Sequence, residues 1–215
     1  LLRRRRRNYL NFFFIMENII ILCLSYLLGS FPSGYIAGRL VANLDLREVG
    51  SGSTGATNVL RHVGKWPALS VFLIDISKGI CAVLIAKSFG LNDIFEVCCG
   101  LLAVFGHIWP IWLNGKGGKA VATGLGIFLG FSWPAALISL GVFIIVLLIS
   151  RMVSLSSLIA SMSLPFLMFY GVGNGSFSLA YFIVSLITMA AVIWRHRSNV
   201  RRILLGKEPK IWSSK

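Results

Sequence analysis

Acidic residues are scarce in this chain of 215 residues, which carries 7 Asp and Glu against 21 Lys and Arg. Charged residues of both signs make up 13% of the sequence, which is about half the share found in an ordinary soluble domain. Hydrophobic residues reach 56%. This composition excludes a typical water-soluble domain and indicates an integral membrane protein.

Residues that bind metals are also few. The 3 histidines are scattered, and the 4 cysteines lie in apolar runs without the spacing of a metal site. The acidic residues are too few and too dispersed for a Mg²⁺ cage. We therefore predict no metal site and no cofactor. The cysteines are expected to be small buried hydrophobic residues, and they are Cys23, Cys81, Cys98 and Cys99.

Long apolar stretches, by contrast, occur throughout the chain. A helix that spans the bilayer needs about 20 apolar residues, and the sequence shows none of the alternation that marks the strands of a membrane barrel. We predict an all-α integral membrane protein with seven transmembrane helices, or six if the short fourth stretch only re-enters the membrane. The predicted spans are residues 18–40, 66–88, 92–113, 119–131, 133–150, 153–170 and 178–194.

Cations decide the predicted orientation, because cytoplasmic loops are enriched in Lys and Arg. The C-terminal segment "WRHRSNVRRILLGKEPK" is strongly basic and is therefore placed in the cytoplasm. Seven spans then put the N-terminus outside and the loops that carry most cations inside, namely residues 41–65, 114–118 and 151–152. The opposite loops, "FGLND", "FSW" and "GVGNGSFS", have almost no cations.

The basic run "RRRRR" at residues 3–7 conflicts with an external N-terminus. We interpret residues 1–15 as a non-native or misannotated N-terminal extension, with Met16 as the start. Residues 16–215 are then a single seven-helix domain. The alternative is that the number of spans is off by one.

A polar, glycine-rich segment, "GSGSTG" at residues 50–55, follows the first predicted span. It matches the G-x-G-x-x-G pattern, but no strand precedes it and no βαβ unit surrounds it, which excludes a dinucleotide-binding fold. Successive glycines expose backbone N–H groups that bind phosphate oxygens, and Arg61 and Lys65 follow. The alternative is a loose loop that contacts lipid head groups.

A second polar segment, "GHIWPIWLNGKGGKAVATG", leads into the short fourth span. Glycines and lysines at the start of an apolar helix attract phosphate through free N–H groups and charge. The segment is not a Walker A loop, because Leu113 and Ala120 replace the required glycine and Ser or Thr. His107 is either a functional polar residue or a packed one. The phosphate-binding candidates are Lys116, Gly117, Gly118 and Lys119.

Two further polar segments follow, "RMVSLSS" at residues 151–157 and "RHRSNVRRILLGKE" at residues 195–208. The serines of the first could simply cap a helix, and the second could be a basic membrane anchor. His196 and Asn199 lie three residues apart, on one face of a helix, for which an anchor has no use. Within a span, Asp75 and Lys78 are expected to pair, either as a structural clasp or at the edge of a polar cavity.

Taken together and in this order, the segments resemble the bacterial membrane glycerol-3-phosphate acyltransferases that use acyl-phosphate as donor. The resemblance covers nearly the whole chain after Met16. It rests on "GSFPSGY", "VGSGSTGATNVLR", "DISKG", "GHIWPIWLNGKGGKAVATG", "RMVSLSS" and "HRSN". It implies a seven-span protein of the bacterial inner membrane, with an external N-terminus and an active site on the cytoplasmic face.

The resemblance also implies site residues. Those implied in catalysis are Ser51, Arg61, Lys119 (or Lys116), His196 and Asn199. Those implied in substrate binding are Gly50, Gly52, Ser53, Gly55, Thr57, Asn58, His107, Lys116, Gly117, Gly118, Ser157 and, as a weaker match, Ser154. Asp75, Lys78 and Glu208 are expected to be structural. The chain departs from the family at Ser53, where an asparagine is usual, and we expect an altered contact there without loss of function.

The activity implied is transfer of a fatty acyl group from acyl-phosphate to the 1-hydroxyl of sn-glycerol 3-phosphate, giving lysophosphatidic acid and phosphate. The H-x-x-x-x-D motif of thioester-dependent acyltransferases is absent, because no histidine has an aspartate five positions later. Expected partners are the two substrates and membrane lipids, with no nucleic acid, and the protein is expected to be a monomer. The alternatives are a transporter of an organic phosphate and a non-catalytic scaffold that binds lipid.

Overall fold

The computed structural model describes the backbone of residues 2–211 and the side chains of residues 15–211. Within this range the chain forms ten α-helices and one 3-10 helix, without a strand. They are α1 (Leu2–Ser30), α2 (Ser33–Ala42), α3 (Ala56–His62), α4 (Lys65–Ser88), α5 (Asp93–Ile108), η1 (Ile111–Leu113), α6 (Val121–Phe131), α7 (Trp133–Ser150), α8 (Val153–Gly173), α9 (Leu179–Arg195) and α10 (Arg197–Leu204).

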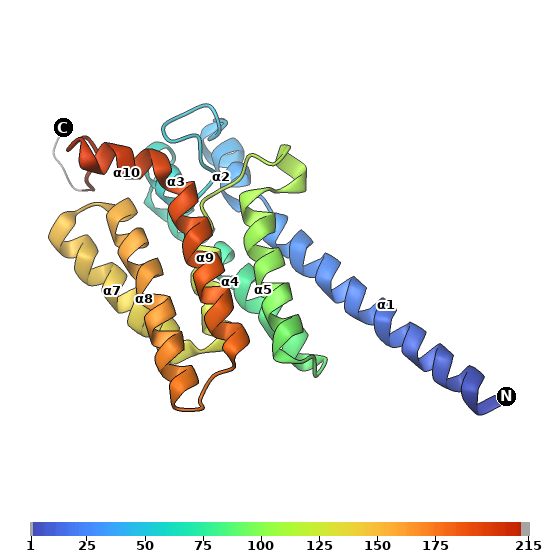
Figure 1. Ribbon diagram of the computed structural model, residues 1–215. Helices are drawn as coiled ribbons and strands as arrows, with labels where there is room; N and C mark the ends of the chain where they lie inside the picture. The colour runs from blue at the N-terminus through green and yellow to red at the C-terminus, as the bar shows by residue number, and fades with distance from the viewer. Residues whose placement is uncertain (1, 212–215) are drawn as a thin grey trace.

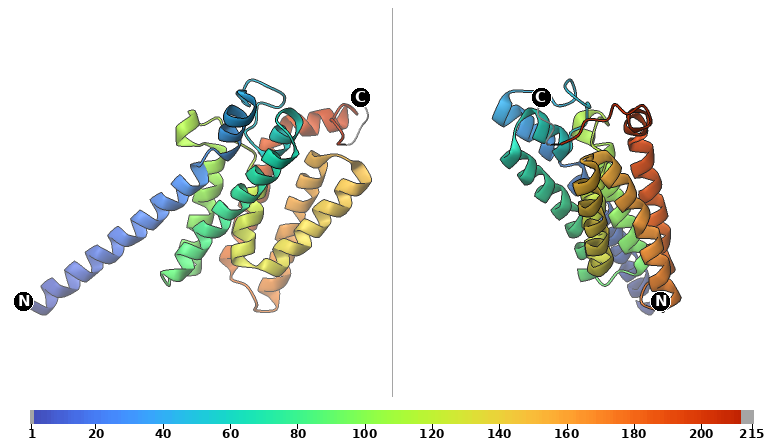
Figure 2. Two further views of the ribbon diagram at one scale, coloured as in Figure 1. Left: turned by 180° about the vertical axis from the view of Figure 1, so that it is seen from behind. Right: turned by 90° about the vertical axis from the view of Figure 1, so that its left-hand side faces the viewer.

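The two ends of the helical bundle differ (Figure 1). Figure 2 shows α2, α3, η1 and α10 at one end, with the long connection between α2 and α3. The N-terminal end of α1 lies at the other end, with the short connections α4–α5, α6–α7 and α8–α9. The polar segments that the sequence spreads over more than 150 positions therefore meet at the first end, which we call the loop-rich end.

Five helical segments among the described residues are long and apolar enough to cross a membrane: Ile15–Ala42, Lys65–Ser88, Asp93–Leu113, Trp133–Ser150 and Val153–Gly173. A sixth results if α9 and α10, bent by 62° relative to each other, are counted as one span. The predicted fourth stretch contains α6, which has 11 residues. Such a helix is about 16 Å long, short of a hydrocarbon core of about 30 Å.

The short helix α6 is nevertheless a central element of the bundle, because glycines let it approach α4 closely. A Cβ atom added to Gly126 would lie 2.1 Å from the carbonyl oxygen of Ile76, and one on Gly79 would lie 2.4 Å from that of Thr123. Small residues at such crossings allow two helix backbones to touch. The apolar core beside α6 includes Val83, Val104, Ile127, Phe128, Met168 and Val184.

The cysteines correct one expectation. Only Cys99 is buried and Cys98 is half-buried, whereas Cys23 and Cys81 are exposed on the sides of α1 and α4. Both helices belong to segments that are apolar enough to span a membrane. An apolar face turned toward lipid has the same composition as a buried one, so sequence alone cannot distinguish the two.

Candidate active site

A cavity of about 200 Å³ lies between the helices at the loop-rich end. Along α8 its wall changes from Ser154 and Ser157 to Leu164, which is about 10 Å deeper at 1.5 Å per residue. We call the two regions the polar end and the apolar arm. The polar end is lined by Ser51, Thr57, Arg61, Lys119, Ser154, Ser157, His196, Asn199 and Glu208. The apolar arm is lined by Phe72, Leu125, Leu140, Phe143 and Leu164.

The glycine-rich segment is organised around the side chain of Asn58. Its Nδ2 group lies 3.0 to 3.1 Å from three backbone carbonyl oxygens, which belong to Leu46, Val49 and Ser53. Its Oδ1 atom accepts the N–H of Ser51 at 3.3 Å. Because these bonds use its polar groups within the fold, Asn58 shapes the segment. It also lines the cavity, and the contact with substrate that the resemblance implied stays a prediction.

Gly50 and Gly52 turn the chain in this segment and do not face the cavity. Gly50 and Gly52 have φ angles of 58° and 66°, a region that only glycine adopts without strain. Neither lines the cavity, whereas Ser51, Ser53 and Gly55 do. The segment therefore presents its serines, and not the whole run of glycine N–H groups, to a ligand.

Arg61 reaches the cavity from α3, which follows the glycine-rich segment. Within residues 15–211 its guanidinium group has no hydrogen-bond or ion-pair partner. A cation that faces a cavity without a counter-ion is available to an anionic ligand, and a guanidinium group binds phosphate through paired hydrogen bonds.

Lys119 faces the same cavity, and its Nζ atom donates a hydrogen bond of 2.6 Å to Oδ1 of Asn199. Burial lowers the pKa of Lys119 to about 8; nearby Arg202, Arg61 and Arg195 act in the same direction, and Glu208 opposes them. Helix α6 begins two residues later, and its first N–H groups have no partner within the helix. The amine and the helix start together favour an anion in the cavity.

Gly117 and Gly118 do not offer the free N–H groups that the sequence predicted. Gly117 donates to the carbonyl of Ile108 at 3.2 Å, and Gly118 donates to that of His107 at 3.0 Å. A Cβ atom on Gly118 would lie 2.0 Å from Nε2 of His107, so the glycine allows the chain to cross α5 closely. The side chain of Lys116 is exposed and does not line the cavity, so the geometry favours Lys119 over Lys116.

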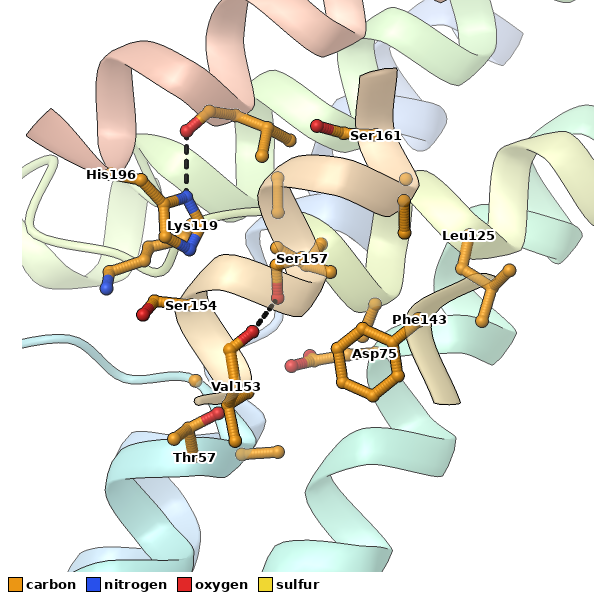
Figure 3. A pocket seen from close by; sticks show the side chains of 18 of the residues that line it. Thr57, Asp75, Lys119, Leu125, Phe143, Val153, Ser154, Ser157, Ser161 and His196 are labelled. Carbon is orange, nitrogen blue, oxygen red and sulfur yellow. Dashed lines mark hydrogen bonds between the residues drawn. The ribbon is translucent and has the colours of Figure 1, made fainter. Parts of the chain in front are cut away.

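His196 occupies the bend between α9 and α10 and lines the cavity together with Lys119 and Ser157 (Figure 3). Its Nδ1 atom lies 2.8 Å from the carbonyl oxygen of Val192. A carbonyl can only accept, so Nδ1 carries the hydrogen and Nε2 carries a lone pair. The hydroxyl of Ser157 donates to the carbonyl of Val153 at 2.8 Å and keeps its own lone pairs for another donor.

Glu208 connects three elements around the polar end. Its Oε1 atom accepts from Ser154 at 2.8 Å and from Asn199 at 2.7 Å, and its Oε2 atom accepts from Arg202 at 2.8 Å. Burial opposes its ionisation, but these three hydrogen bonds outweigh burial and lower its pKa. Glu208 thus fastens the C-terminal segment to α8 and α10, and it orients Asn199 toward Lys119.

Asp75 and Lys78 form a buried ion pair of 2.9 Å at the inner side of the cavity. Asp75 also accepts from Ser33 at 2.7 Å, while Lys78 donates to the carbonyl of Phe31 at 3.3 Å. Nδ1 of His107 lies 3.7 Å from Asp75. The pair is therefore a clasp that joins the break between α1 and α2 to α4 and α5, and through Asp75 and His107 it also borders the cavity.

The apolar arm contains residues that the sequence analysis did not select. Phe72 on α4, Leu125 on α6 and Phe143 on α7 line it, together with the hydroxyl-bearing Ser139 and Thr188. On a membrane helix an apolar residue that faces a cavity looks like one that faces lipid. No sequence signal separates these positions from their neighbours.

Known proteins resemble this chain over most of its length. The profile of the family described as glycerol-3-phosphate acyltransferase matches residues 19–206. A glycerol-3-phosphate acyltransferase of Prochlorococcus marinus (strain NATL2A) is 57% identical over 194 residues, which are 90% of this chain and 98% of the relative. One of Synechococcus sp. (strain CC9902) is 58% identical over 197 residues, 92% of this chain and 96% of the relative.

Solved structures give the same result. The crystal structure of PlsY (YgiH), an integral membrane glycerol 3-phosphate acyltransferase, in its glycerol 3-phosphate form has a TM-score of 0.84 and 36% identity, covering 91% of this chain and 96% of PlsY. Its lysophosphatidic acid form has a TM-score of 0.79 and 35% identity, covering 90% and 95%. The resemblance drawn from the sequence motifs is thus confirmed, and the chain belongs to the glycerol-3-phosphate acyltransferase family.

Proposed function

We propose that this protein transfers a fatty acyl group from acyl-phosphate to the 1-hydroxyl of sn-glycerol 3-phosphate. The observation that carries the proposal is the single cavity that joins two cations, Arg61 and Lys119, to an apolar arm. The side chains that line the cavity match the substrates, because both substrates are phosphate anions and one carries a hydrocarbon chain. The membership of the family supports the same activity.

The polar end has the groups needed to hold two phosphates. Arg61 approaches from α3, and Lys119 approaches from the segment before the start of α6. Hydrogen bonds from a charged donor to phosphate are stronger than neutral ones. Ser51 would add a hydroxyl to the acyl-phosphate, and Asn199 and His196 would orient the glycerol backbone.

The apolar arm has the lining for the part of an acyl chain that lies nearest the phosphate. Along α9 the cavity is bordered by both His196 and Thr188, which are about 12 Å apart at 1.5 Å per residue. Phe72, Leu125 and Phe143 cover its sides. Burial of each methylene group in such a lining contributes about 0.8 kcal/mol, so the chain would anchor the donor while its phosphate end stays among the cations.

The chemistry then requires positioning above all. The 1-hydroxyl oxygen of glycerol 3-phosphate attacks the acyl carbon, a C–O ester bond forms, and the bond from that carbon to the phosphate oxygen breaks. Inorganic phosphate leaves with the electron pair, and we propose that a substrate phosphate oxygen takes the hydroxyl proton. A mixed anhydride is a strong electrophile, and holding the two reactants in line supplies much of the rate.

The histidines in the cavity wall support this proton route. His107 lies near the carboxylate of Asp75, but its Nε2 atom is packed against Gly118, where an added Cβ atom would lie 2.0 Å away. His196 has an open Nε2, but its Nδ1 partner is the neutral carbonyl of Val192. That partner fixes the tautomer without supplying a counter-charge for an imidazolium. His196 is therefore assigned a hydrogen bond to the glycerol and not proton removal.

We further propose seven membrane crossings in the bacterial inner membrane, with α6 and α9 as the sixth and seventh crossing elements beside the five longer segments. The N-terminus is then outside and the active site faces the cytoplasm. The positions of the polar motifs and of the chain ends at opposite ends of the bundle support this topology (Figure 2). The loop cations lie mainly at the end that carries α10, as the charge rule requires.

The topology predicts a labelling pattern. In a variant whose four cysteines are replaced by alanine, single cysteines are introduced at the exposed positions Glu48, Asn174 and Lys207. Glu48→Cys and Lys207→Cys should react with an impermeant maleimide from the cytoplasmic side only, and Asn174→Cys from the external side only. Reaction of Asn174→Cys and Lys207→Cys from the same side would contradict seven crossings.

The activity itself is tested by reconstitution. Purified protein in lipid vesicles receives radiolabelled glycerol 3-phosphate and palmitoyl-phosphate, and lysophosphatidic acid and released phosphate are measured together. The proposal expects equal amounts of both products. A transporter of organic phosphate would give uptake of the label without lipid product, and a lipid-binding scaffold would give neither.

A further inference from the structure

The segment that carries Lys119 has no regular structure of its own. It runs from the end of η1 to the start of α6, residues 114–120. Asn114 and Ala120 both have positive φ angles, 51° and 58°, a region that disfavours residues with a side chain. A segment with this backbone needs contacts from outside to keep one conformation.

Those contacts come from two sides. The N–H groups of Gly117 and Gly118 donate to the last carbonyls of α5, at Ile108 and His107. On the other side, the guanidinium group of Arg195 donates to both carbonyls: Nε to Gly118 at 3.0 Å and Nη2 to Gly117 at 3.2 Å. The backbone directly before Lys119 is therefore fixed through four hydrogen bonds, and a single side chain supplies two of them.

Arg195 links the segment before Lys119 to the bend that carries His196. It is the last residue of α9 and directly precedes His196 at the bend. Its guanidinium group also packs over the ring of Trp194, 5.7 Å from the ring centre. It does not line the cavity, so it does not touch a ligand there. We infer that Arg195 is a positioning residue. Its hydrogen bonds to the backbone of Gly117 and Gly118 set the place of Lys119 relative to His196.

This inference rests on the proposed function, since it concerns how a phosphate-binding lysine is held. The alternative is that Arg195 is only one more cation at the membrane surface. Arg197 provides the comparison, because it is exposed, lies two residues away, and packs over the same ring at 5.0 Å. Its hydrogen bond goes to the carbonyl of Trp194 and not to the segment before Lys119.

The test compares Arg195→Met, Arg195→Lys and Arg197→Met in the reconstituted full-length protein. Methionine keeps an apolar stem for Trp194 and removes the donors and the charge. We expect Arg195→Met to lower kcat/KM for glycerol 3-phosphate about 100-fold per amount of folded protein, the size of effect known for small misplacements of a reacting group. Arg195→Lys can still reach one carbonyl and should recover part of the loss, and Arg197→Met should match the wild type.

A pH profile separates positioning from general stability. Arg195 is one of the cations that lower the pKa of Lys119, so Arg195→Met should raise that pKa. We expect kcat/KM to fall at alkaline pH as Lys119 loses its proton near pH 8. This alkaline limb should move to higher pH in Arg195→Met, while Arg195→Lys should leave it in place. The charged or titratable groups around Lys119 are Arg61, Arg195, His196, Arg202 and Glu208.

Hydrogen exchange gives a readout that does not depend on turnover. Peptides covering residues 114–120 should exchange at least about tenfold faster in Arg195→Met, with α7 unchanged. The inference would be overturned if Arg195→Met kept the kcat/KM, the exchange rate and the alkaline limb of the wild type. It would also be overturned if the amount of folded protein alone explained the loss of activity. If the wild type makes no lysophosphatidic acid, the proposed function fails, and the exchange result still decides whether Arg195 holds the segment.

Discussion

Replacement of Lys119 with alanine should lower kcat for lysophosphatidic acid formation by about 10²- to 10³-fold, the loss seen when one donor to a developing charge is removed from an enclosed site. Lys119 reaches the polar end of the cavity, where its ammonium group is held by Asn199 at 2.6 Å. After its removal, Arg61 is the lysine or arginine that remains in the described cavity wall. The measurement is turnover of purified, lipid-reconstituted protein at saturating substrates and near pH 7.

Two control variants distinguish loss of a substrate contact from an unspecific effect of mutation or from misfolding. Lys116→Ala lies in the same segment but is exposed and outside the cavity wall, and an exposed substitution of this kind changes energies by within about 0.5 kcal/mol. It should therefore keep activity within about twofold. Glu208→Ala should instead reduce the amount of folded protein, because it leaves Ser154, Asn199 and Arg202 without their common acceptor. Equal losses in Lys119→Ala and Lys116→Ala would contradict the assignment.

The sequence was sufficient to find the polar motifs but not to say what each residue does. Arg61, Lys119, His196 and Asn199 were selected as one set and do line one cavity. The polar motifs were conspicuous in an apolar chain, and the resemblance of these motifs to a known family implied which of their residues form the set. Lys116 and Lys119 looked equivalent, since the direction of a side chain in an irregular segment depends on contacts with distant helices.

The glycines illustrate why the remainder could not be read from the sequence. A glycine in a phosphate-binding loop and one at a close crossing of two backbones are the same letter. Gly117 and Gly118 belong to the second kind, because their N–H groups pair with α5 and one of them touches the ring of His107. Asn58 is a similar case, since its four partners come from a loop whose shape was unknown.

The boundaries of the helices were limited by the same difficulty. The predicted fourth stretch begins at 119, but the helix starts at Val121 because Lys119 and Ala120 belong to the segment held by α5 and α9. Its 11 residues are too few for a conventional span, and only its packing against α4 through Gly79 and Gly126 shows that it is an inner element. Hydropathy alone does not contain that information.

The donor should be acyl-phosphate, with acyl-CoA and acyl carrier protein thioesters rejected. Acyl transfer from a thioester normally uses a positioned base. Among the described residues of the cavity wall, the only histidine near an aspartate is His107. Its Nε2 atom is covered by Gly118. Among residues 15–211 no carboxylate is hydrogen-bonded to His196, whose Nδ1 atom pairs with the carbonyl of Val192, and Glu208 acts on this ring only through its charge. The site thus lacks the base that a weak electrophile would need, whereas an anhydride brings its own phosphate acceptor.

The shortness of the connecting segments also argues against a CoA thioester as donor. The connection between α2 and α3, residues 43–55, is the longest irregular segment at the loop-rich end of the described chain, and it is far below the lower limit of about 50 residues for a domain that could bind a nucleotide. Purified protein in lipid is given glycerol 3-phosphate with palmitoyl-phosphate, palmitoyl-CoA or palmitoyl acyl carrier protein in turn. Product should form with palmitoyl-phosphate alone. Efficient product formation from palmitoyl-CoA without any from palmitoyl-phosphate would show that the mechanism is wrong, even if the acceptor is correct, because the cavity would then be activating a thioester without a base.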